Sequence, residues 1–169
     1  MATFQAGINF NLAILNGQAT ATTMTTIVAG TSQLPSAMAP ISVSTTAAGL
    51  IRIAGRASPG CGGGIIVPTT TPGIRVGTFR MTNPNSTAFA SSSTPNLVFT
   101  ASTAITPSYA TRYAYYAAAT CLGTQAVVTP GVNANVIENP VLNPIKLIQL
   151  QLFLEGLYST NLGLMRKSW

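Results

Sequence analysis

The sequence predicts an all-β protein, built as an antiparallel β-sandwich or jelly roll. Two observations predict this fold class: short segments with apolar residues at every second position, and clusters of Gly, Pro, Asn and Ser between them. The 11 Pro and 15 Gly in 169 residues also leave few uninterrupted windows for a long helix. A chain of this length can bury a core as one domain.

The predicted strands follow from period-2 patterns. Residues 3–10 (TFQAGINF) have four apolar residues on one face, namely Phe4, Ala6, Ile8 and Phe10. Residues 49–57 (GLIRIAGRA) place two isoleucines on one face and, on the other, Leu50, Arg52 and Arg56. Residues 74–81 (IRVGTFRM) alternate similarly, and residues 96–103 and 125–129 are short β-branched or aromatic runs.

Two further segments could be strands or helices, and we predict strands for both. Residues 110–120 (ATRYAYYAAAT) are rich in Ala, but their aromatic and threonine residues alternate as in a strand. Residues 147–157 contain four alternating aliphatic residues, namely Ile148, Leu150, Leu152 and Leu154. Pro140 and Pro144 precede them and favour an extended approach.

Charge is scarce in this sequence. Only 6% of residues are charged, against about 25% in an ordinary soluble domain, while 47% are hydrophobic. A neutral surface does little to prevent association, so it suits a protein that is packed into an assembly, coated with glycans or extracellular. The net charge of +6 reflects few acids and dispersed bases, which argues against nucleic-acid binding.

The residue inventory predicts that the chain is not an enzyme and holds no metal or cofactor. It has no His and no Asp, so it cannot form a Ser-His-Asp or Cys-His arrangement or a usual zinc site. The only carboxylates, Glu138 and Glu155, are expected to be solvated. The glycine cluster in residues 56–68 (RASPGCGGGIIVP) lies between two strand patterns, without the helix and Lys-Ser/Thr that a phosphate loop needs.

Two pairs of alternatives remain open for particular side chains. Cys61 and Cys121 are expected to form one disulfide in an oxidising compartment, the alternative being two buried free thiols. The candidate contact surface consists of Tyr109, Arg112, Tyr113, Tyr115 and Tyr116. Tyrosines suit a sugar or protein interface because they combine an apolar ring with a polar tip, but alternating tyrosines also pack in cores.

The chain is expected to divide into a β-sandwich domain at 1–139, a Pro/Asn linker at 140–146, and a C-terminal strand and tail at 147–169. It has no apolar run long enough for a transmembrane helix. Its first residues lack the basic and apolar regions of a signal peptide, so a secreted form would have lost its signal or carry it outside this sequence.

Several phrases in order along the chain resemble a known family. They include FQAGINFNLAILNG, IRIAGRASPGCGGG, GIRVGTFRMTNPNSTAF, YATRYAYYAAATCLGTQ and LQLFLEGLYSTNLGLMR. They are similar to modules of the secreted, multi-domain surface proteins of Bacteroidota, many of which use type IX secretion. The resemblance implies a secreted sandwich of cohesin-like or carbohydrate-binding-module-like shape. It also implies that the chain lacks the first strand of that sandwich and carries an additional last strand.

These observations predict a non-catalytic extracellular structural subunit at the cell surface. We expect it to self-assemble into a filament or array by β-strand complementation, so that a strand from a neighbouring subunit completes the sandwich. The predicted intersubunit strand contains Ile148, Leu150, Leu152 and Leu154, which face a core in the same chain or in a neighbouring subunit. The alternative is a monomeric, adhesin-like or cohesin-like module that binds polysaccharide or a cell-surface protein.

Overall fold

The computed structural model describes residues 3–38, 41–46, 49–57, 74–90, 93–99, 111–116, 125–128 and 147–154. In this part of the chain the fold is all-β, because nine strands pair antiparallel in two sheets. The helical segments here are single 3-10 turns of three or four residues, at Leu12–Leu15, Ser36–Met38 and Pro84–Ser86. The predicted all-β class is therefore confirmed.

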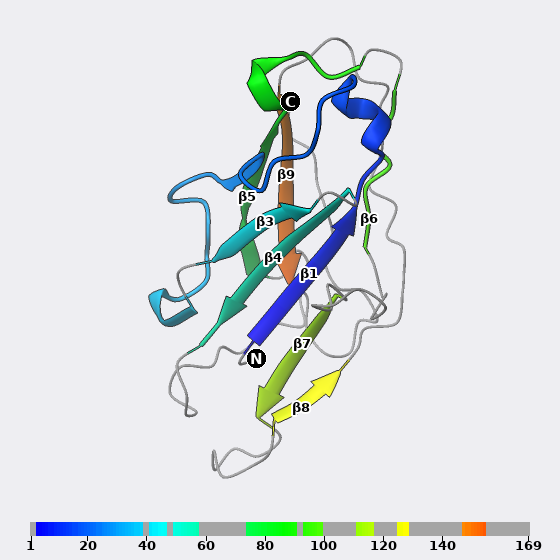
Figure 1. Cartoon of the computed structure of the whole chain (residues 1–169). Helices are drawn as coiled ribbons and strands as arrows, with labels where there is room; N and C mark the ends of the chain where they lie inside the picture. The colour runs from blue at the N-terminus through cyan, green and yellow to red at the C-terminus, as the bar shows by residue number, and fades with distance from the viewer. Residues whose placement is uncertain are drawn as a thin grey trace.

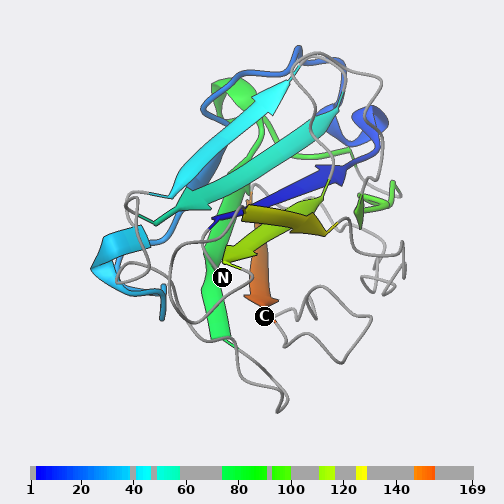
Figure 2. The same ribbon diagram turned by 90° about the horizontal axis from the view of Figure 1, so that it is seen from below.

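The larger sheet has the strand order β3-β4-β1-β7-β8, and β6 also pairs with β1 (Figure 1). Its strands are β1 (Thr3–Asn9), β3 (Ser42–Thr46), β4 (Leu50–Arg56), β6 (Val98–Phe99), β7 (Arg112–Tyr116) and β8 (Gln125–Val128). The smaller sheet has the order β2-β5-β9, with β2 at Thr25–Ile27, β5 at Ile74–Thr82 and β9 at Leu147–Leu154. Figure 2 shows the same two sheets from below.

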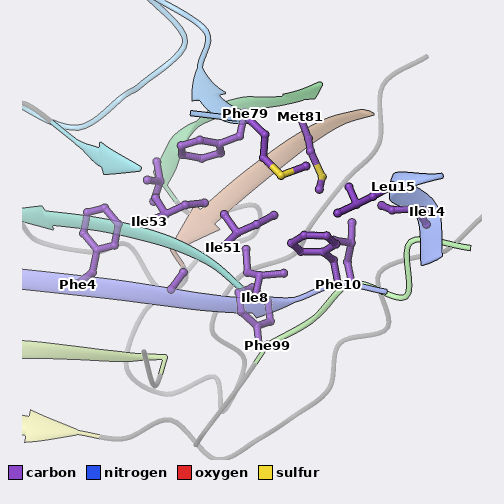
Figure 3. Close-up of a cluster of buried hydrophobic side chains, with 14 of the residues drawn as sticks. Phe4, Ile8, Phe10, Ile14, Leu15, Ile51, Ile53, Phe79, Met81 and Phe99 are labelled. Atoms are coloured by element: carbon purple, nitrogen blue, oxygen red, sulfur yellow. The ribbon is translucent and has the colours of Figure 1, made fainter. Parts of the chain in front are cut away.

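Both sheets contribute side chains to one hydrophobic core. The apolar face predicted for residues 3–10 is confirmed, because its four residues, in β1 and directly after it, are all buried: Phe4, Ala6, Ile8 and Phe10. On β4 the two predicted core residues, Ile51 and Ile53, are fully buried. Figure 3 shows Phe79 and Met81 of β5 on the other side of this cluster.

One cross-strand pair in this core has no room for a larger residue. Phe4 lies directly opposite Gly55 in the register of β1 and β4. A Cβ atom at Gly55 would lie 2.5 Å from Cε1 of the Phe4 ring. The glycine therefore provides the space in which the aromatic ring packs, which explains its place in the interior of a strand.

On the edge of β1 that faces β6 and β7, a threonine side chain fills the gap in the ladder of backbone hydrogen bonds. β7 pairs with residues 3–5 of β1, and β6 pairs with Ile8 and Asn9. Between them, the Thr111 hydroxyl accepts a hydrogen bond from the Gly7 N–H at 3.1 Å and donates one to the Gly7 carbonyl oxygen at 3.0 Å. A buried side chain thus satisfies both backbone groups of Gly7.

The two sheets are also joined at one corner by threonines. The backbone N–H of Thr45 on β3 donates to the Thr22 carbonyl oxygen at 3.2 Å. The Thr45 hydroxyl donates to the Thr25 hydroxyl oxygen at 3.1 Å, and both side chains are buried. The β2 and β3 edges therefore meet at this corner.

The strand predictions differ from the structure in two places. Within the described residues 96–99, only Val98–Phe99 forms a strand, and residues 100–103 lie outside the described residues. The register of β5 shifts between Arg75 and Gly77, so the simple alternation expected for this segment does not run along the whole strand. Leu50, which was predicted on the same face of this strand as Arg52 and Arg56, is buried at the start of β4.

Candidate functional site

The candidate site consists of the outer edges of two strands, each of which ends its sheet without a further strand in the described part of the chain. β8 pairs only with β7 there, and β9 pairs only with β5. These two edges lie at the opposite ends of their sheets from the β2–β3 corner. We refer to the edges of β8 and β9 together as the open side.

β9 runs along the whole of β5, from the pair Thr82–Leu147 to the pair Ile74–Leu154. The prediction of a strand in this segment is confirmed. Its four predicted residues lie opposite residues of β5, in the pairs Met81–Ile148, Phe79–Leu150, Gly77–Leu152 and Ile74–Leu154. Met81 and Phe79 are fully buried core residues. The register therefore places three of these positions opposite every second residue of β5, and the core-facing role of their side chains stays a prediction.

The pairing of β9 with β5 lies within one chain. The sequence left open whether this strand completes its own sheet or that of a neighbour, and the structure of the single chain contains the first arrangement. The intersubunit role of Ile148, Leu150, Leu152 and Leu154 stays a prediction. So does the boundary at residues 140–146, which lie outside the described residues.

The sequence of β9 lacks several of the features that usually protect an edge strand. Proteins commonly shorten edge strands, or place charges, Pro or bulges on them, to prevent pairing with another chain. The eight residues of β9, LIQLQLFL, include no charged residue and no Pro. The other strands at sheet ends are shorter, with three residues in β2, five in β3 and four in β8.

Two arginines of the described residues support the fold through hydrogen bonds. Nε of Arg52 donates to Oε1 of Gln5 at 2.8 Å, across the pair of strands β4 and β1. Nε of Arg75 donates to the Thr31 carbonyl oxygen at 2.7 Å, and the backbone N–H of Arg75 donates to Oε1 of Gln33 at 2.9 Å. Arg75 thereby fixes the segment that follows β2 against β5.

The described residues contain no Asp, Glu, His or Cys. Glu138, Glu155, Cys61 and Cys121 all lie outside them, so the predicted disulfide and the state of both carboxylates stay predictions. Within the described part, no cluster of metal-ligating side chains occurs. Arg56 and Arg80 are exposed there, on β4 and β5.

The residues of the candidate contact surface are not all brought together. Tyr109 lies outside the described residues. The other four, Arg112, Tyr113, Tyr115 and Tyr116, are on β7, which confirms the predicted strand. Successive positions of a strand belong to opposite faces of the sheet. Positions 112 and 116 therefore fall on one face of β7, and positions 113 and 115 fall on the other.

Sequence reasoning missed the threonines that control the edges of the sheets. Thr111 bridges β6 and β7 along β1, and Thr22, Thr25 and Thr45 hold the β2–β3 corner. Thr111 lies in a segment predicted as a strand, whereas no strand was predicted for the segments of Thr22, Thr25 and Thr45. The one available signal was their β-branched character, which favours strands but does not indicate where a hydroxyl will bond.

Comparison with known proteins gives no functional assignment for this chain. No protein-family model, no curated protein and no solved structure matches it. None of the helical segments in the described ranges has the length and apolar character needed to cross a bilayer.

Proposed function

We propose that this chain is a non-catalytic structural subunit that assembles with copies of itself by strand pairing, in an extracellular filament or surface array. The observation that carries the proposal is the edge of β9 that no described strand pairs with. It is eight residues long, uncharged and without a strand partner among the described residues. Such an edge is a template for another strand, and a protein that remains monomeric normally protects it.

We further propose that the two sheets form a β-sandwich of jelly-roll or cohesin-like shape, closed at the β2–β3 corner and completed at the open side by a neighbouring subunit. Its support is the shared core, to which β1 and β4 contribute from one sheet and β5 from the other. Facing sheets pack with their inner side chains interdigitated, and a core shared by two sheets suits that arrangement. Strand complementation at the open side would satisfy backbone groups that otherwise remain exposed.

The composition and the resemblance support an extracellular location. A surface with so few charges has little electrostatic resistance to close packing of identical copies, which suits an array. The similarity to secreted surface proteins of Bacteroidota points to the same location. The described fold offers no acid, base or metal-ligand cluster on which catalysis could be built.

Sedimentation velocity over a range of concentrations, with electron microscopy of the same samples, tests the proposal. We expect the purified chain to sediment as species larger than a monomer, with their fraction rising with concentration. Electron micrographs should then show filaments or regular arrays. A chain that remains monomeric at the highest attainable concentration would contradict the proposal.

A second candidate function is a monomeric module that binds polysaccharide or a cell-surface protein. The observation that favours it is β7, a strand with three tyrosines and an arginine next to β1. Glycan arrays should compare the native chain with Tyr113→Ala, Tyr115→Ala and Tyr116→Ala, each tested separately. Binding that falls about tenfold or more in one variant would support this function, since tyrosine anchors dominate many interfaces. Absence of binding would argue against it.

A further inference from the structure

The edge of β9 that faces away from β5 restricts the kind of partner that can bind there. The backbone N–H and C=O groups of a strand alternate between its two neighbours, so half of those in β9 point away from β5. Among the described strands, none pairs with that edge. A row of alternating backbone donors and acceptors is best satisfied by another extended strand.

We propose that the occupant is β9 of a second copy of this chain, paired antiparallel about a two-fold axis at Leu150. This inference rests on the proposed function, because it names the contact through which two copies associate. It creates one continuous sheet in which the strands β2, β5 and β9 of one copy are followed by β9, β5 and β2 of the other.

The sequence of β9 is self-complementary in this register. Residues directly opposite each other in an antiparallel pair lie on the same face of the sheet. Apolar residues of one strand must therefore lie opposite apolar residues of the other, and polar residues opposite polar residues. Pairing about Leu150 sets Ile148 opposite Leu152 of the partner copy, and Gln149 opposite Gln151 of the partner copy. Aliphatic residues then face each other at positions 148, 150 and 152, the glutamines at 149 and 151 face each other, and Leu147 faces Phe153 of the partner copy.

Electrostatic repulsion does not oppose this contact. β9 carries no charge, and the nearest described cation in register is Arg80, which lies opposite Gln149 on β5. In the paired sheet, two strands separate Arg80 from the same residue of the partner copy. Three strand spacings amount to about 14 Å, which exceeds the Debye length of about 8 Å at physiological salt. Screening therefore removes most of the repulsion.

A two-fold contact closes on itself, so it produces a dimer. Growth of the dimer into a filament or array requires a second contact. The edge of β8 is the other half of the open side, and it is one strand edge in the described part of the chain that could make that contact.

Replacing both glutamines of β9 with charged residues, either lysine or glutamate, tests this contact. In the lysine variant (Gln149→Lys with Gln151→Lys), each lysine faces a lysine of the second copy. The dimer dissociation constant should therefore rise about tenfold to a hundredfold. The glutamate variant (Gln149→Glu with Gln151→Glu) should weaken the dimer in the same way. An equimolar mixture should form a heterodimer at least as tightly as the unmodified chain, because opposite charges then face each other.

Native mass spectrometry can measure the mixture if one variant is labelled with nitrogen-15. The matched control is Thr23→Lys with Thr26→Lys, which adds the same charge at two exposed positions at the other end of the sheet. This control should dimerise as the unmodified chain does. Recovery of the heterodimer also shows that both charged variants remain folded.

The possible results distinguish failure of the proposed β9 contact from failure of the proposed self-assembly. If the unmodified chain is a monomer, both fail together. If the unmodified chain assembles and the lysine variant assembles equally well, or the mixture shows no preference for heterodimers, self-assembly stands and the β9 contact is overturned. Loss of assembly in both variants with recovery in the mixture supports the β9 contact.

Discussion

Gly55→Ala should destabilise the fold, although alanine loses less backbone entropy on folding than glycine and can adopt the backbone conformation of this position. An interior strand glycine costs about 0.5–1 kcal/mol relative to alanine, because glycine loses more backbone entropy on folding. Gly55 has no left-handed backbone angle, so alanine fits its conformation. The new Cβ atom would nevertheless lie 2.5 Å from Cε1 of Phe4, whereas carbon atoms in contact lie about 3.5–4.0 Å apart.

The free-energy cost of the clash between the new Cβ atom and the Phe4 ring should exceed the entropic stabilisation that alanine provides. The Phe4 ring is buried in the core, so moving it by about 1 Å also displaces its neighbours. Overpacking of this kind costs about 1–3 kcal/mol, which leaves a net loss of about 1–2 kcal/mol in the free energy of unfolding. The corresponding fall in Tm is about 2–4 °C for each kcal/mol in a chain of this size.

A double-mutant cycle measured by denaturant unfolding isolates the clash. In a Phe4→Leu background the ring is absent, so Gly55→Ala should be neutral or stabilise by about 0.5 kcal/mol. The coupling energy between the two sites should therefore be about 2 kcal/mol. Gly55→Ala that is harmless in the native background, or equally costly in both backgrounds, would refute the reasoning.

Two further predictions concern the threonines at the sheet edges. Thr111→Val should lower the free energy of unfolding by about 2–3 kcal/mol and speed hydrogen exchange at the Gly7 amide, because two buried backbone groups lose their partner. Thr111→Ser should restore most of the stability, and equal effects of valine and serine would argue against the bridge. Thr25→Val and Thr45→Val should each cost about 1 kcal/mol, since each leaves one buried hydroxyl unpaired. The double variant should cost less than the sum of the two, and simple additivity in unfolding experiments would count against a coupled pair.

The strands that the sequence revealed are those with one apolar and one polar face. β1 and β4 alternate because their inner residues enter the core, so Ile8, Ile51 and Ile53 could be placed there in advance. The same reasoning favoured strands over helices for the segments of β7 and β9, and the structure confirms both. Burial on one face produces a local pattern, which is why it can be read without the structure.

Features that depend on distant contacts could not be predicted. β2 and β3 are short and rich in Ser and Thr, so no apolar alternation indicated them. The shift in register between Arg75 and Gly77 and the bridge from Thr111 to Gly7 depend on which strands become neighbours. The candidate site shows the same limit: the strand at 147–154 could be predicted, but its position at the end of a sheet follows only from the topology.

The lack of carboxylates in the described fold has a consequence for its behaviour in acid. Most proteins unfold at low pH because carboxylates that are paired in the native state must take up protons. Here the described hydrogen bonds of Arg52 and Arg75 end on amide and backbone carbonyl oxygens, which do not titrate in this range. The denaturant midpoint of the chain should therefore be nearly the same at about pH 3 as at about pH 7. A large fall in acid would reveal that Glu138 or Glu155 is paired in the folded chain. A chain built in this way would keep its fold in surroundings acidic enough to unfold proteins held together by ion pairs.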